Sequence, residues 1–326
     1  MKNWWRGVQN PERFQGALRT KDYFEGWYYK LVDKTGSHAV ALIPGVSISS
    51  PSDKHAFIQL MDGTGGKSHY YRFPFEAFSS DENKLDISIG SNRFSKTNIH
   101  VDLPDIQADL QISDLTPLNT SMFNPGIMGW YSFTPMMECY HGIVSMHHKL
   151  HGIVKHEGKS WDYEGGTGYI EKDWGTSFPK CWFWTHSNTF NVSEKVSLMA
   201  SVAHIPWMGH YFIGFIVALQ WGDEQVRFAT YNGAKMKARL DEDALYLQFK
   251  RGNRVLSIKS IKGPSAELIS PISGEMTGKV NESLQAKLLV KLEENGHPLL
   301  IAEGHSGGLE IAGDIDILLS DKWRSR

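Results

Sequence analysis

Two carboxylates and three tryptophans lie within the stretch Gly168–Trp184, whose sequence is GYIEKDWGTSFPKCWFW. A proline separates two strand-like pieces of this stretch. Successive side chains of a strand point to opposite faces. If the first piece is extended, Tyr169, Glu171 and Asp173 therefore share one face, which presents two acids.

The second piece of the stretch is mainly aromatic. If residues 181–188 are extended, one face carries Trp182, Trp184, His186 and Asn188. Two neighbouring segments then offer acids on one and aromatic and polar groups on the other. This mixture favours a ligand pocket over a plain hydrophobic core.

A second tract that combines an acid with aromatic residues is YFEGWYY, at Tyr23–Tyr29. It is predicted as a strand on which Glu25, Trp27 and Tyr29 share one face, with Tyr28 on the other. An acid flanked by aromatic side chains suggests a carboxylate in a pocket. The alternative is an amphipathic strand whose glutamate is exposed to solvent.

Histidines gather in Met137–His151, MECYHGIVSMHHKLH, which holds four of the chain's 14 histidines. Clustered histidines suggest a metal site, but the tract has no HExxH motif and no cysteine pair. We therefore expect no metal and mainly hydrogen-bonding roles, with one histidine able to act as an acid or base.

Short segments rich in β-branched or aromatic residues recur every ~8–15 residues and are bounded by turn-forming residues. No segment keeps an apolar period of about 3.6 residues over three turns. The pattern predicts an all-β protein of antiparallel barrels or sandwiches, with residues 1–22 and 113–130 irregular. The predicted strands are 24–32, 38–43, 56–61, 69–75, 85–89, 106–112, 136–151, 196–204, 211–220, 226–231, 244–250, 254–260, 284–292 and 299–303.

The aromatic content differs between the two halves of the chain. Eight of the 11 tryptophans lie at or before residue 184. We place a domain boundary accordingly, between an aromatic-rich N-terminal β domain (1–190) and a C-terminal β domain (191–326).

Composition narrows the class of partner and compartment. Acidic (36) and basic (34) residues nearly cancel, and no basic tract appears, which argues against nucleic acid as a partner. Cys139 and Cys181 fit free thiols in a reducing compartment, with a single disulfide as the alternative. The first residues contain no apolar stretch and no run approaches the ~20 residues of a membrane span. These features predict a cytoplasmic protein without a signal peptide or transmembrane segment.

The tracts YFEGWYYK, GYIEKDWGTSFPKCWFW with Asn188, and MECYHGIVSM resemble the tocopherol cyclase family and its bacterial relatives. The resemblance follows residues 11–320 in order and is specific in the N-terminal half. It implies two lipocalin-like β-barrel halves with a ligand cavity, and no redox cofactor. The chain has EKDW at 171–174 where the plant motif runs EKNW, and THSN at 185–188 where the plant motif runs VQCN. By comparison with the plant cyclases, we also expect no transit peptide.

The plant cyclases convert a prenylated hydroquinone into a chroman by adding a phenol O–H across a trisubstituted alkene. Such a site needs a protonated carboxylic acid, aromatic faces around a tertiary cation, and exclusion of water. Asp173 aligns with the plant asparagine, so Glu171 is the first candidate for the acid and Glu25 the second. The expected substrate contacts are Trp27, Tyr28, His141, Trp174, Trp182, Trp184, His186 and Asn188.

We expect Glu171 to point into an aromatic cavity between the two halves and to protonate a hydrophobic small molecule there. Two other functions are compatible with the sequence. One is a non-catalytic lipocalin-like carrier of a hydrophobic small molecule, and the other is a hydratase that adds water to a prenyl alkene. A carrier needs no buried carboxylic acid, so the environment of Glu171 distinguishes it from an enzyme.

Overall fold

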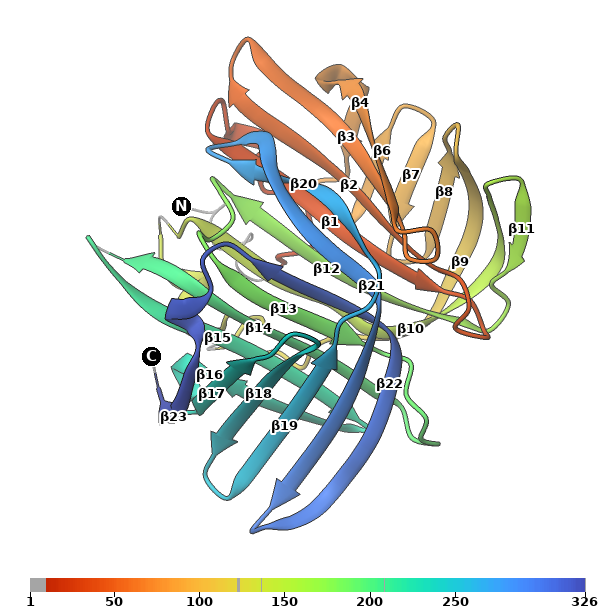
Figure 1. Ribbon diagram of the computed structural model, residues 1–326. Coiled ribbons are helices and arrows are strands. Elements are labelled where there is room, and N and C mark those ends of the chain that lie inside the picture. The colour runs from red at the N-terminus through yellow and green to blue at the C-terminus, as the bar shows by residue number, and fades with distance from the viewer. Residues whose placement is uncertain (1–9, 122–123, 136, 208, 326) are drawn as a thin grey trace. The chain divides into compact units, whose positions relative to one another are not determined.

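The computed structural model describes residues 10–121, 124–135, 137–207 and 209–325 (Figure 1). This part of the chain contains 23 β-strands, five short 3-10 turns and no α-helix, which confirms the predicted all-β class. The strands form two sheets, and the chain divides into two compact units that are described separately. Over the same residues, no helix has the length and apolar character needed to cross a membrane.

The first unit comprises the described residues up to Phe178 together with Leu268–Lys279. Its 12-stranded sheet has the order β4-β3-β2-β1-β12-β10-β9-β8-β7-β6-β5, with β11 paired to β10. The elements are η1 (Gly16–Leu18), β1 (Tyr23–Val32), β2 (Ala39–Ser50), β3 (Asp53–Asp62), β4 (Lys67–Pro74), η2 (Phe75–Ala77), β5 (Phe78–Ser80), β6 (Asp86–Ile89), β7 (Asn92–Ser95), β8 (Asn98–Asp102), β9 (Ile106–Thr116), η3 (Gly129–Phe133), β10 (Cys139–His156), β11 (Lys159–Asp162) and β12 (Gly166–Gly175).

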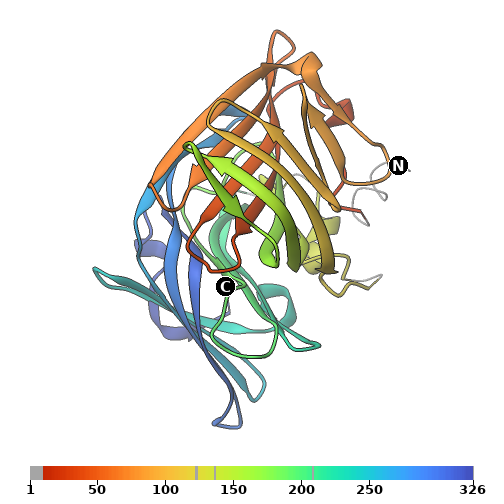
Figure 2. The same ribbon diagram turned by 90° about the vertical axis from the view of Figure 1, so that its right-hand side faces the viewer.

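The core of the first unit lies on one face of this sheet. Along β9, buried Ile106, Ala108 and Leu110 alternate with exposed neighbours, as expected for a half-buried strand. One apolar cluster joins residues from strands far apart in the sheet order, such as Leu42 of β2 and Ile99 of β8. The sheet therefore curls around its own core, as its strands show in Figure 2.

The second unit comprises Pro179–Glu267 and the described residues from Val280 onward. Its 11-stranded sheet has the order β16-β15-β14-β13-β22-β21-β19-β18-β17-β23, with β20 paired to β21, and its apolar cluster includes Phe183, Phe215 and Leu288. The elements along this sheet are β13 (Trp182–Ser187), β14 (Val196–Trp207), β15 (His210–Trp221), β16 (Glu224–Ala229), η4 (Thr230–Asn232), β17 (Lys235–Leu240), β18 (Ala244–Arg251), β19 (Arg254–Ile261), β20 (Ser265–Ile272), β21 (Glu275–Glu294), β22 (His297–Ala312), η5 (Asp316–Leu318) and β23 (Ser320–Arg324). The part of β20 and β21 within Leu268–Lys279 belongs to the first unit.

The hairpin between β20 and β21 returns the chain to the first unit. The Gln59 side chain donates to the carbonyl of Ile269 and accepts from its N–H, both at 2.9 Å. Ser47 donates to the carbonyl of Gly274 at 2.7 Å. Gly274 has a φ of +80°, and a Cβ there would lie 2.4 Å from the backbone nitrogen of Tyr23, so only glycine fits this approach.

The structure corrects the predicted strand pattern in two places. The segment 113–130 is only partly irregular, because β9 continues to Thr116 and η3 begins at Gly129. The sequence pattern also missed β5, β7, β8, β11, β17, β20 and β23, most of which are short or lack strong alternation.

Other expectations concern the chain ends, the cysteines and the domains. The expectations of an irregular first segment and of no signal peptide concern mostly residues 1–9, which lie outside the described residues. Both cysteines are free thiols. The domain boundary at 190/191 stays a prediction.

Candidate functional site

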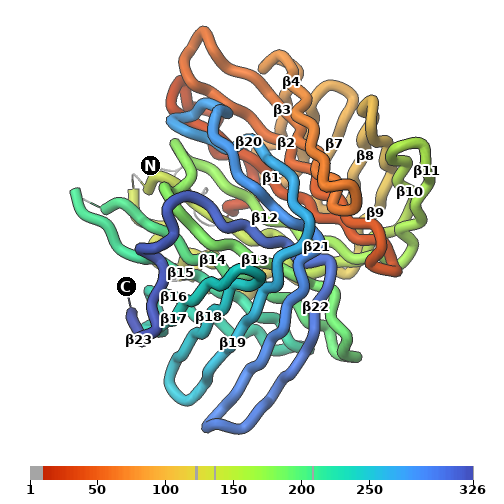
Figure 3. Tube along the Cα trace, in the orientation of Figure 1, coloured from red at the N-terminus to blue at the C-terminus, as the bar shows by residue number. Residues whose placement is uncertain are grey.

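β12 carries the two acids, and its position between β1 and β10 sets their neighbours (Figure 3). Glu171 lies opposite Tyr28 of β1 and Ile143 of β10. Asp173 lies opposite His141 of β10. Strand alternation therefore places the acids and His141 on the same face, as the sequence predicts for Glu171 and Asp173.

His141 joins the two acids through both of its ring nitrogens. Its Nδ1 lies 2.8 Å from Asp173 Oδ1, and its Nε2 lies 3.4 Å from Glu171 Oε2. Tyr169 donates its hydroxyl hydrogen to Glu171 Oε2 at 2.6 Å. We call Tyr169, Glu171, His141 and Asp173 the acid–histidine cluster.

Burial differs along the acid–histidine cluster. The Glu171 side chain is 6% exposed and that of Asp173 is 24% exposed. Burial, then the nearby charge of Glu171, raises the pKa of Tyr169 well above its ordinary value. Tyr169 therefore stays a protonated donor to Glu171 over the physiological pH range. The cluster combines a buried acid, a fixed donor and a histidine held by a second, more exposed acid.

Glu25 lies on the opposite face of the same sheet, because it shares the face of Trp27 and Tyr29. It forms an ion pair of 2.5 Å with Lys172, and both side chains are fully buried. Glu25 also accepts the Tyr23 hydroxyl at 2.5 Å and the backbone N–H of Gln15 at 2.9 and 3.0 Å. These contacts suit a structural carboxylate, and they separate Glu25 from Glu171.

Lys172 organises this second face. Its Nζ lies 4.9 Å from the centre of the Trp27 ring and 4.7 Å from that of Trp174, within the range of cation–π contacts. It also donates to the carbonyls of Pro11, at 2.7 Å, and Arg13. Burial lowers the pKa of Lys172, and the charge of Glu25 opposes that shift. Trp27 and Trp174 thus lie on the face opposite to Glu171.

The remaining predicted residues belong to β13 and the residue after it, in the second unit. Trp182 donates its indole N–H to Glu310 at 2.5 Å. The Trp184 and His186 rings stack with centres 6.1 Å apart, and His186 and Asn188 are buried. Trp182, Trp184 and His186 share the strand face opposite to Phe183, as alternation predicts. Their contact with Glu171 in a common cavity stays a prediction.

Two cavities lie elsewhere in the described chain. One of about 550 Å³ in the first unit is lined in part by Phe14, Ile48, Phe75 and Phe78, and its lining includes neither Glu25 nor Glu171. The other, of about 690 Å³, lies in the second unit.

Two groups of side chains in the described residues have donor atoms close enough to hold a metal ion. One group is His141, Glu171 and Asp173. Here each ring nitrogen faces a different carboxylate, so the group is better arranged to hold and pass a proton than to ligate one ion. The other group is His38, Asp62 and His156. None of these residues belongs to Met137–His151, the histidine-rich tract for which the sequence predicts no metal.

Sequence reasoning missed two contacts at this site. It did not foresee that His141 bridges Glu171 and Asp173, although strand parity places His141 and Ile143 on one face of β10. It also did not pair Glu25 with Lys172. Alternation places Lys172 on the face of β12 opposite to Glu171 and Asp173, but only the pairing register shows that this is also the Glu25 face of β1.

The fold resembles several solved structures. A putative ATTH from Nitrosomonas europaea is 16% identical with a TM-score of 0.52, over 89% of this chain and 92% of that chain. CghA with Sch210972 is 11% identical with a TM-score of 0.56, over 92% and 89%. Kievitone hydratase from Nectria haematococca is 10% identical with a TM-score of 0.51, over 94% and 97%. The chain is thus an all-β protein with the lipocalin-like fold of these structures.

The family model described as tocopherol cyclase-like matches residues 117–313. The match includes β12, β13 and the His141 strand, and the chain belongs to this family. A probable tocopherol cyclase of Oryza sativa subsp. japonica is 31% identical over 74 residues, and a tocopherol cyclase of Zea mays is 32% identical over 74. Each match covers 22% of this chain and 16% of the relative's length.

Proposed function

We propose that this chain is an acid-catalysed cyclase that closes a chroman ring on a prenylated hydroquinone or a related prenyl lipid. The observation that carries the proposal is the acid–histidine cluster, which combines a buried glutamate and a second acid of β12 with a histidine of β10 on one face of these paired strands. Membership of the tocopherol cyclase-like family supports the class of reaction.

The hydrogen bonds of His141 define where a transferable proton is held. An ionised Asp173 can only accept, so the 2.8 Å contact makes His141 Nδ1 the donor. A neutral His141 then presents the Nε2 lone pair to Glu171. We place the transferable proton between Glu171 Oε2 and His141 Nε2, which lie 3.4 Å apart. Glu171 is therefore the proposed acid, with His141 as its proton reservoir and Asp173 as the group that orients His141.

The proposed reaction balances without exchange of electrons. Glu171 transfers its proton to the less substituted alkene carbon, which leaves a tertiary cation. The phenol oxygen attacks the cation, a C–O bond forms, and the phenol proton returns to the glutamate. Substrate and product are isomers, so the reaction requires no oxidant or reductant.

Aromatic side chains must stabilise the cation, and water must be excluded so that the phenol captures it first. Within the first unit, Tyr28 is the aromatic residue directly opposite Glu171 on β1. The sequence assigns the same task to Trp182 and Trp184, and the orientation of the phenol to His186 and Asn188. These four assignments form part of the proposal.

Incubation of the purified full chain with a prenylated hydroquinone, followed by mass spectrometry, tests the proposal. A chroman with the mass of the substrate is the expected product. A product heavier by one water would instead identify a hydratase, because water rather than phenol would have captured the cation. Tight binding without conversion would identify a carrier and contradict the proposed catalysis.

A further inference from the structure

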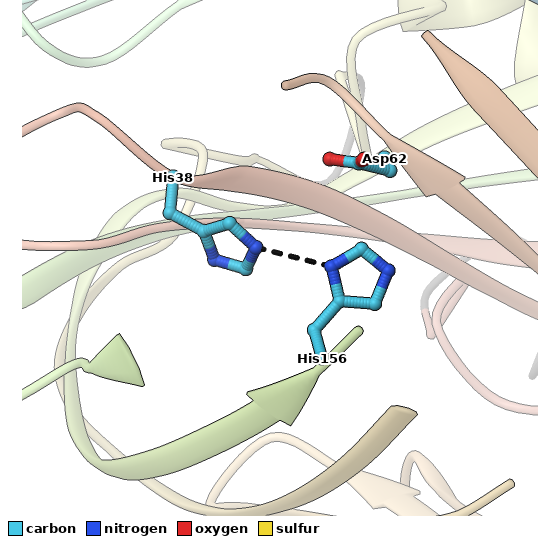
Figure 4. A group of neighbouring side chains, drawn as sticks. All are labelled: His38, Asp62 and His156. Carbon is cyan, nitrogen blue, oxygen red and sulfur yellow. Dashed lines mark hydrogen bonds between the residues drawn. The ribbon is translucent and has the colours of Figure 1, made fainter. Parts of the chain in front are cut away.

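Three side chains far apart in sequence meet at one end of the first unit: His38, Asp62 and His156. His38 directly precedes β2, Asp62 ends β3, and His156 ends β10. All three are buried, and their donor atoms lie within 4.8 Å of one another. Figure 4 shows the two imidazole rings facing each other, with the Asp62 carboxylate beside them.

The two facing nitrogens have a separation that fits a shared ion as well as a shared proton. His38 Nε2 lies 3.2 Å from His156 Nδ1. Zinc–imidazole bonds of about 2.0–2.1 Å at tetrahedral angles place two ligand nitrogens about 3.3 Å apart. An ion can therefore replace the shared proton without a large movement of either ring.

Tyr163 fixes the tautomer of His38. The Tyr163 hydroxyl lies 2.9 Å from His38 Nδ1 and donates to the His38 carbonyl at 3.4 Å. Its oxygen therefore accepts the N–H of Nδ1, which leaves the lone pair on Nε2. Ligating histidines commonly have such a partner on their other ring nitrogen.

Asp62 supplies a buried carboxylate with a fixed orientation. Its two oxygens accept the backbone N–H groups of Thr64 at 2.8 Å and Gly65 at 2.7 Å. Each oxygen keeps a second lone pair. Within the described residues, Asp62 forms no ion pair with a lysine or arginine. Because a buried carboxylate is strongly stabilised by a positive charge, a bound cation would stabilise Asp62.

We propose that His38, Asp62 and His156 form a site for one divalent transition-metal ion of the zinc class, with Tyr163 as a positioning residue. Two imidazoles and one carboxylate match the donor preference of such ions. The site lies apart from the acid–histidine cluster and involves none of its residues. His38 and Asp62 lie at the ends of the neighbouring strands β2 and β3, whereas His156 comes from β10, which β1 and β12 separate from β2 in the sheet order. A bound ion would therefore tie the end of β10 to the ends of β2 and β3.

Titration of the tag-free full chain with Co²⁺, and separately with Zn²⁺, tests the site after removal of metals with a chelator. We expect one ion per chain, a visible Co²⁺ absorption typical of four-coordinate geometry, and a higher melting temperature with Zn²⁺. Asp62→Asn and His156→Gln should abolish this binding. Tyr163→Phe keeps all three ligands and should weaken binding by about 10–100-fold.

The matched control is His100→Gln, which breaks an exposed histidine–aspartate contact in the same unit and should leave metal binding unchanged. Circular dichroism identifies any variant that fails to fold, and Tyr163→Phe then serves as the conservative test. The proposal is wrong if the unaltered chain binds no stoichiometric ion. It is equally wrong if Asp62→Asn and Tyr163→Phe both bind Co²⁺ as tightly as the unaltered chain.

Discussion

Glu171 and Glu25 are both buried glutamates on paired strands, but their partners differ. Glu25 forms an ion pair of 2.5 Å with the buried Lys172 and accepts further hydrogen bonds, so its carboxylate is held in a structural role. Glu171 contacts a tyrosine and a histidine, both of which can exchange or stabilise a proton. The difference predicts opposite outcomes for the same substitution at the two positions.

At Glu171, replacement by glutamine keeps shape and hydrogen bonding but removes the transferable proton. We expect turnover of a prenylated hydroquinone to fall by ~10²-fold or more, the usual scale of general acid catalysis, with little change in melting temperature. Glu164→Gln is the matched control, because Glu164 is exposed and pairs with the partly exposed His151 in the same unit. Full activity of Glu171→Gln would remove this residue from the mechanism.

At Glu25, replacement by glutamine leaves Lys172 buried without its counter-charge. Breaking one partner of a buried ion pair typically costs about 3–5 kcal/mol. Urea unfolding of Glu25→Gln should show a loss of this size. An unchanged unfolding free energy would show that the ion pair is not structural and would return Glu25 to the candidate acids.

At the scale of elements, β10 and β12 enclose a histidine that has no catalytic assignment. A Cβ at Gly168 of β12 would lie 2.1 Å from His148 Nε2, so only glycine leaves room for this ring. The pairing of β10 with β12 shifts register on both sides of Ser145. The hydroxyl oxygen of Ser145 lies 3.1 Å from His148 Nδ1. Burial, then the nearby His147, lowers the pKa of His148 from 6.5 to about 3.

This shift makes the stability of the protein depend on pH. Between pH 6.5 and 3 the unfolded chain binds a proton at residue 148 and the folded chain does not, so stability falls as the pH falls. At about 1.36 kcal/mol per pH unit, His148 accounts for a loss of about 2 kcal/mol between pH 7 and pH 5. Denaturant unfolding of His148→Gln at both pH values should show that much less pH dependence. An unchanged pH dependence would contradict the account, and exposed His100→Gln is the control.

The alternation of side chains between the two faces of a strand is the feature of this protein that the sequence predicts best. It correctly grouped Tyr169, Glu171 and Asp173, and it correctly separated Tyr28 from Trp27. It could not say which face of β1 matches which face of β12, because that depends on the pairing register. The separation of Trp27 and Trp174 from Glu171, and the meeting of His141 with both acids, therefore required the structure.

At the scale of the whole molecule, the chain leaves the first unit after Phe178 and returns to it at Leu268–Lys279. This return could not be predicted from the sequence, because the hydrogen bonds between Gln59 and Ile269 join residues 210 apart. Composition conveys only the aromatic shift along the chain, and it contains no information about long-range pairing.

The returning segment should contribute measurably to stability. Gln59→Ala leaves the N–H and carbonyl of the half-buried Ile269 without their side-chain partner. We expect an unfolding free energy lower by about 1–3 kcal/mol, the range for stranded polar groups. Gln107→Ala is the control, because its hydrogen bond to Asp102 is exposed. A loss equal to that of the control would show that the segment is only loosely attached.

The central claim is that the chain protonates a prenyl alkene and lets the phenol capture the cation. Conversion of a prenylated hydroquinone in D₂O, followed by return of the product to H₂O, tests it most directly. Protonation by Glu171 predicts a chroman with one non-exchangeable deuterium on the carbon beside the new C–O centre, formed at least ~10²-fold more slowly by Glu171→Gln. A chroman without deuterium, or no conversion of the substrate, would contradict the account.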